Sequence, residues 1–93
     1  MYRTQLRIIA DVLTTARDFG AAEDGVGVTM LLRKANLPYS RLVRILKDLV
    51  SSGLLEQSAQ ERGNKYKISE RGLSLLVAYS NFEDFARSFG LRI

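Results

Sequence analysis

The sequence predicts a small, mainly α-helical domain that carries one β-hairpin and ends in a helix. Apolar residues recur at three- and four-residue steps in several segments, which is the period of an α-helix. Two short segments of strand-like composition flank a polar stretch that contains Gly63-Asn64, a pattern typical of a hairpin. The 93 residues, 46% hydrophobic and 26% charged, are typical of one soluble domain.

Three helices are predicted in the first half of the chain. Residues 4–19 carry one apolar stripe with charged residues opposite it. Residues 28–35 form a shorter helical pattern, and residues 36–38 interrupt it because a proline disfavours helix at the residue before it. Pro38 also suits the first turn of a new helix, which is expected at residues 38–52. The buried stripe of this third helix is expected to be Leu42, Val43, Leu46, Leu49 and Val50.

A hairpin and a long helix are predicted to follow. Residues 54–69 form the hairpin, with strands at 54–58 and 65–69 and a charged tip between them. Residues 70–89 form the last helix, and a capping-box pattern at Ser80 leaves open a break near that point. The side of this helix that packs on the domain is expected to carry Leu73, Leu76, Val77 and Ser80.

The order of these elements is helix, helix, turn, helix, hairpin, helix. A short helix, a three-residue break and a longer basic helix make a helix-turn-helix, and a hairpin directly after it makes a wing. The predicted fold is therefore a winged helix-turn-helix, in a single domain that spans residues 1–93 and ends in a C-terminal helix.

The basic charge is concentrated in the middle of the chain. The formal net charge is +4 and the pI is about 9.8. Residues 33–71 hold nine basic and four acidic side chains, whereas the segments on either side are close to neutral. A binding surface for an anionic partner is therefore expected in this segment.

The exposed positions of the third helix are the first candidates for contact with DNA. In a helix-turn-helix, the second helix enters the major groove and meets base edges through its first turns. Arg can hold a guanine through two hydrogen bonds, Ser and Tyr can bond phosphates or bases, and Lys supplies a mobile charge. The alternative is a solvated face whose charges only keep the protein soluble. The candidates are Tyr39, Ser40, Arg41, Arg44 and Lys47.

Two further pairs of cations are candidates for contact with the phosphate backbone. Arg33 and Lys34 end the second helix, where they can also simply complement the helix dipole. Arg62 and Lys65 lie in the wing, and arginine is favoured in the minor groove that a wing can enter. The alternative for the strand lysine is protection of a sheet edge against aggregation.

A second apolar stripe on the last helix predicts self-association. Five residues follow heptad-like steps of three and four, and three of them are Phe. On a helix whose other side packs on the domain, such a stripe would leave a large apolar patch on a monomer. A homodimer interface is expected; the alternative is that the helix folds back and these residues complete one core. The stripe is Leu75, Ala78, Phe82, Phe85 and Phe89.

Composition excludes most catalytic and metal sites. The chain has no His and no Cys, which removes the Ser-His triad, the commonest general base and nearly all zinc sites. The acidic pairs Glu23-Asp24 and Glu83-Asp84 are more typical of solvated charge than of a paired acid and base. No enzyme activity, metal, cofactor or small-molecule ligand is predicted. No apolar run approaches a membrane span, so a cytoplasmic, nucleoid-associated protein is expected.

Four segments carry a resemblance when they are taken together: Ile8-Ile9, Lys34–Arg41, Leu46–Leu55 and Lys65–Gly72. They resemble archaeal winged-helix proteins, and in particular the ten-kilodalton DNA-binding protein family of Sulfolobus and its predicted-regulator relatives. That family has an Asn-Leu-x-Tyr entry to the recognition helix, a Gly-Leu-Leu/Ile exit into the wing and a Tyr-x-Ile/Leu-Thr/Ser-x-x-Gly end to the hairpin. The resemblance covers roughly residues 5–80.

The resemblance implies binding of double-stranded DNA and a dimer joined by an antiparallel pair of C-terminal helices. Carried over by position, it implies DNA contacts by Tyr39, Ser40, Arg41 and Arg44. The family has a long C-terminal coiled coil, whereas here thirteen residues follow Ser80, so a short Phe-lined contact is expected instead.

The predicted function is sequence-specific or architectural DNA binding by an archaeal transcriptional regulator that acts as a homodimer. The alternative function is a winged-helix module that binds another protein and not DNA. The clustered charge on the third helix argues against this alternative, because protein-binding faces are more apolar and aromatic.

Overall fold

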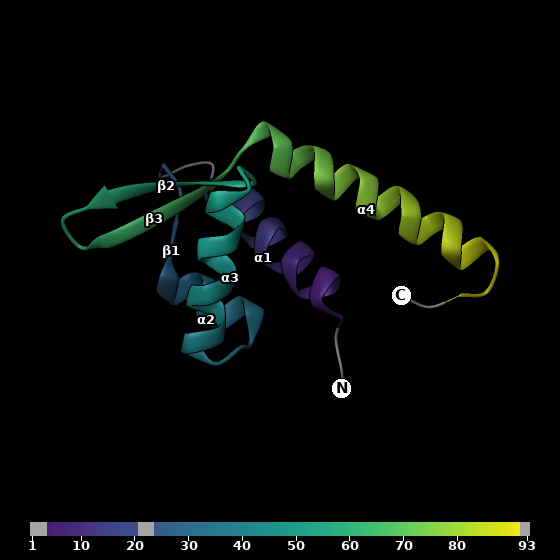
Figure 1. The fold of residues 1–93 in the computed structure, drawn as a ribbon, viewed down its shortest axis with the longest axis horizontal. Helices are drawn as coiled ribbons and strands as arrows, with labels where there is room; N and C mark the ends of the chain where they lie inside the picture. The colour runs from purple at the N-terminus through teal and green to yellow at the C-terminus, as the bar shows by residue number, and fades with distance from the viewer. Residues whose placement is uncertain (1–3, 21–23, 92–93) are drawn as a thin grey trace.

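Four helices and a three-stranded antiparallel sheet make up the structure, a computed structural model that describes residues 4–20 and 24–91. The body holds α1–α3, and the sheet and α4 project from it in opposite directions (Figure 1). This arrangement confirms the predicted fold class. The elements are α1 (Gln5–Gly20), β1 (Val26–Gly27), α2 (Val28–Ala35), α3 (Tyr39–Ser51), β2 (Leu55–Gln60), β3 (Gly63–Ile68) and α4 (Glu70–Ser88).

The core lies where the three helices of the body meet the base of the sheet. Helix α3 buries Leu42, Ile45, Leu46 and Leu49, which repeat at steps of three, one and three and therefore share one side of the helix. The same cluster contains fully buried leucines from α1, α2 and β2. The prediction that Val43 belongs to this stripe is wrong: Val43 lies outside the cluster and is exposed.

The turn between α2 and α3 forms where the sequence predicts it. Asn36 ends α2 with φ 54° and ψ 53°, a left-handed conformation that Asn tolerates better than most residues. Pro38 precedes the first turn of α3 with an extended ψ, and its carbonyl accepts the backbone N–H of Leu42 at 3.0 Å. This short turn fixes α3 against α2 as the second helix of a helix-turn-helix.

The wing is part of a three-stranded sheet with the order β1-β3-β2. Strand β1 has no signal in the sequence, because a two-residue strand carries no alternation; in the structure it pairs Val26 with Tyr66. The strands of the hairpin also run further than predicted, and the chain reverses at Glu61-Arg62. Gly63, with φ 119°, follows this turn inside β3, so Gly63-Asn64 is not itself the turn.

Helix α4 is continuous from its first residue to its last, so the break that the sequence left open at Ser80 does not occur. Its start is fixed by Ser69, whose hydroxyl accepts the N–H of Gly72 at 3.1 Å and donates to the carbonyl of Gly53 at 2.6 Å. Its end is a Schellman motif in which Gly90 has φ 76° and the N–H of Leu91 bonds the carbonyl of Ala86.

The side of α4 that faces the body differs from the predicted one. Gly72 and Leu76 are buried there and Tyr79 is partly buried, whereas Leu73 and Val77, predicted to pack on the domain, are exposed. The close approach of Gly72 to the Leu54 carbonyl accounts for this difference, because it fixes the rotation of the helix about its axis. Two exposed apolar strips therefore remain, one on either side of the contact with the body.

An ion pair joins α4 to α1. Arg7 donates to a Glu83 carboxylate oxygen at 2.7 Å, and its Nε lies 3.6 Å from an Asp11 oxygen. The neighbouring Tyr79 hydroxyl raises the pKa of Arg7 most, the two carboxylates raise it further, and desolvation opposes them. Arg7, which like any arginine is charged at working pH, connects the first turn of α1 with α4.

Candidate nucleic-acid interface

The outward face of α3 carries exposed polar and cationic side chains. Ser40, Arg44 and Lys47 lie one helical turn apart, on the side opposite the buried stripe, and all three are exposed. Within residues 4–20 and 24–91, Arg44 and Lys47 form no hydrogen bond and no ion pair. Two unpaired cations on the outer face of the second helix can meet a phosphate or a base edge without first breaking a contact.

Arg41 and Tyr39 lie at the edges of this face. The Arg41 guanidinium reaches toward α1, where it donates to Gln5 Oε1 at 3.4 Å, a long bond between two exposed side chains. Tyr39 is the first residue of α3 and is exposed. Both are therefore available at the entry to the helix, and Arg41 must exchange only a weak contact to bind an anion.

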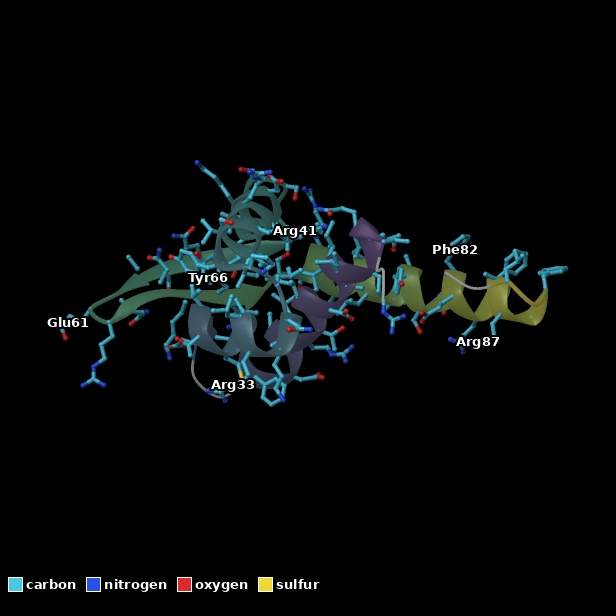
Figure 2. The ribbon with its side chains drawn as sticks, turned by 90° about the horizontal axis from the view of Figure 1, so that it is seen from below. Arg33, Arg41, Glu61, Tyr66, Phe82 and Arg87 are labelled. Carbon is cyan, nitrogen blue, oxygen red and sulfur yellow. The ribbon has the colours of Figure 1, made fainter. Side chains whose placement is uncertain are left out.

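The wing places one of its two candidate cations at its tip. Arg62 is one of the two turn residues and is exposed, and its neighbour Glu61 marks the far end of the wing in Figure 2. Lys65 lies further back on β3, opposite Ser58 and Gly27, and is only partly exposed. The tip of the wing is thus the part that can extend furthest along a nucleic acid.

The structure places Arg33 and Lys34 away from the other candidates. Both are exposed in the last turn of α2, and Figure 2 shows Arg33 at the bottom of the view while α3 lies at the top. Lys34 Nζ lies 5.0 Å from the centre of the Phe19 ring, a cation–π contact that gives this side chain a structural role. The two residues therefore do not share one surface with Ser40, Arg44 and Lys47.

An apolar surface lies on the outer part of α4. Phe82, Phe85 and Phe89 are 54%, 64% and 68% exposed, and the last two rings meet edge to face with centroids 5.1 Å apart. This excludes the alternative in which these rings complete the core of a single chain. Figure 2 shows Phe82 and Arg87 on opposite sides of α4. A groove of about 240 Å³ continues the surface toward the body, lined by Leu6, Leu75, Ala78, Tyr79 and Phe82. We refer to these residues together with Phe85 and Phe89 as the Phe surface.

Val43 was predicted to lie in the core, but its side chain is exposed on α3. The spacing of Leu42, Ile45, Leu46 and Leu49 puts these four residues on one side of the helix and leaves Val43 outside that side. This spacing could have identified Val43 as exposed. Its exposed neighbours along the helix are Ser40 and Lys47.

Within the described part of the chain, no group of His, Cys, Asp and Glu side chains is arranged to hold a metal ion. No helix among the described residues is both long and apolar enough to cross a membrane.

A helix-turn-helix followed by a hairpin, with cations on the second helix and at the tip of the hairpin, defines a winged helix-turn-helix protein. Residues 2–87 match the winged helix-turn-helix family, and the chain belongs to that family.

Solved structures with the same fold come from several organisms. The DNA-binding protein Sso10a-2 of Sulfolobus solfataricus superposes with a TM-score of 0.77 at 22% identity, over 94% of this chain and 85% of that one. AF1382 of Archaeoglobus fulgidus gives a TM-score of 0.70 at 15% identity, over 88% and 89% of the two chains. The MepR G34K mutant of S. aureus gives 0.74 at 13% identity, over 94% of this chain and 63% of that one. None of the curated proteins compared by sequence matches this chain.

Proposed function

We propose that this protein binds double-stranded DNA through α3 and the wing, and that it acts as a homodimeric regulator of transcription. The observation that carries the proposal is a pair of exposed cations, Arg44 and Lys47, on the outward face of α3, neither of which has a partner among the residues that the structure describes. The winged helix-turn-helix fold presents this face to a major groove, and the fold is shared with a structure described as a DNA-binding protein. The function requires no catalytic group, and the protein would act where DNA is, at the nucleoid.

Each part of the surface has a distinct role in this proposal. Arg44 and Ser40, both exposed, would meet base edges, and Arg44 can hold a guanine through two hydrogen bonds. Lys47, Arg41 and Arg62 would contact phosphates and so fix the orientation of α3 in the groove. Lys65, partly covered in the sheet, would act on phosphate only at longer range.

Binding of a duplex to isotope-labelled protein, followed by NMR, tests this surface residue by residue. We expect the backbone amide signals of residues 40–47 and 61–62 to move, because these segments would lie against the DNA. The signals of the last turn of α2, around Arg33, should stay in place. Shifts confined to α4, or no shifts at low salt, would contradict the proposal.

The Phe surface supports the dimeric part of the proposal. Three exposed Phe rings on one side of a helix would be costly to leave in water, and a second copy of the chain can cover them with the same surface. A symmetric pair of α4 helices would carry two copies of α3 on one assembly. Their two recognition helices would then meet half-sites separated by about 34 Å or a multiple of that distance.

Substitution of Phe85 by serine should weaken the dimer. We expect the dissociation constant of the dimer to rise by at least about tenfold, because a buried aromatic anchor is lost from the interface. Sedimentation equilibrium measures this constant directly. The matched control is Val77→Ser, since Val77 is similarly exposed on α4 but on the other side of the helix. A monomeric wild-type protein, or equal weakening by the two substitutions, would contradict a dimer through the Phe surface.

A further inference from the structure

Val43 is an apolar side chain on the face of α3 that is otherwise polar and basic. It is 40% exposed, while the apolar residues of the buried stripe on the same helix are at most 3% exposed. It belongs neither to the core cluster nor to the partly buried residues packed against that cluster. Val43 therefore contributes little to the packing of α3 on the body.

The neighbours of Val43 define the chemistry of its surroundings. One turn before it on the helix surface lies Ser40, one turn after it lies Lys47, and Arg44 follows it in sequence. All three are exposed, and they are the residues assigned to DNA in the proposed function. Val43 therefore adjoins the surface that carries Ser40, Arg44 and Lys47.

We propose that Val43 contacts the 5-methyl group of a thymine and so makes binding depend on thymine at one position of the site. This assignment rests on the proposed function and names a base that this face would select. In the major groove, thymine alone among the four bases presents a methyl group, and apolar side chains are the residues that contact it. Because valine is branched at Cβ, its side chain in a helix has one strongly preferred rotamer, which limits the positions of its methyl groups.

The contact can be isolated with two duplexes that differ only in methyl groups. One is an alternating adenine–thymine duplex, and the other has deoxyuridine in place of every thymidine. Fluorescence anisotropy gives the affinity of each duplex for the wild-type protein and for Val43→Ala. A third protein, Val43→Thr, retains one of the two γ-methyl groups at the same position. Because Val43 is exposed and outside the core, these variants should fold as the wild type does, which circular dichroism checks.

The wild-type protein should bind the thymine duplex about fourfold more tightly for each methyl group that it covers. Val43→Ala should bind the two duplexes with nearly equal affinity, and Val43→Thr should keep much of the preference. If wild type and Val43→Ala show the same ratio of affinities, Val43 does not contact thymine and the assignment is overturned, while DNA binding itself stands. If neither duplex binds at low salt, the proposed function fails, and the assignment fails with it.

Discussion

Replacement of Gly72 by alanine is expected to lower the free energy of unfolding by about 2 kcal/mol or more. A Cβ at this position would overlap the Leu54 carbonyl oxygen and would lie 2.6 Å from Ile68 Cγ1. A backbone oxygen at the start of the wing cannot move aside as the end of a long side chain can. The new methyl group must therefore push α4 away from the wing, although alanine is intrinsically the better helix residue by about 1 kcal/mol.

Thermal unfolding followed by circular dichroism measures this effect, and the expected loss corresponds to roughly 10 °C in the midpoint for a chain of this size. The control is Gly27→Ala, because a Cβ there would meet no atom within 4 Å. Its cost should stay below about 1 kcal/mol, the difference between the two residues at the start of a helix. Equal stability of the two variants would show that α4 does not begin against the Leu54 carbonyl.

Reversal of the charge at Arg44 is expected to weaken DNA binding by about a hundredfold at low salt. The substitution Arg44→Glu removes a contact worth about 1–3 kcal/mol and adds repulsion between a carboxylate and the phosphates. Because Arg44 is assigned to a base edge, the variant should also lose its preference for one DNA sequence, while the dependence of the affinity on salt changes by less than one phosphate. A slope less steep by about one phosphate, with equal loss on all sequences, would instead assign Arg44 to the DNA backbone.

Arg33→Glu is the matched control for this prediction. It makes the same change in net charge at an exposed residue of α2, on the side of the molecule away from α3 (Figure 2). Its effect on affinity should stay within about threefold, because exposed charges beyond about 10 Å are screened at 0.1 M salt. Equal losses of affinity for the two variants would mean that DNA binding depends on the total charge of the protein and not on the outward face of α3.

The sequence predicted the elements that carry strong local signals. The amphipathic period marks α1 and α2, and Asn36 and Pro38 mark the turn between α2 and α3. The sequence reveals these features because the caps and the apolar stripe of a helix are formed by residues that are close together in the chain. They sufficed for the winged helix-turn-helix fold and for the exposed cations of α3.

The rotation of individual helices was harder to predict, because it depends on tertiary contacts. In α3, Val43 and Ile45 lie on opposite edges of the apolar stripe, and the packing of α3 on the body buries Ile45 and leaves Val43 exposed. In α4, apolar residues occur on all sides, so the period gives no unique inward face. The contact of Gly72 with the wing decides which of them are buried.

The sequence also did not predict which of the cations in the basic segment lie on the same side of the molecule as the outward face of α3. Arg33 and Lys34 belong to the basic segment, yet α2 presents them on another side of the molecule from α3. Lys34 also has an aromatic partner, Phe19, which is fifteen residues away at the end of α1. Such a contact depends on how α1 and α2 pack, and no spacing rule within one helix predicts it.

The affinity of the protein for a random-sequence duplex, measured by fluorescence anisotropy across a salt series, tests the central claim most directly. The logarithm of the association constant should fall linearly with the logarithm of the salt concentration, by about 0.9 for each phosphate contacted. If Arg41, Lys47 and Arg62 each meet one phosphate, the slope should be roughly −3 per protomer. Absence of binding at low salt, or an affinity that does not change with salt, would contradict the assignment of α3 and the wing to DNA.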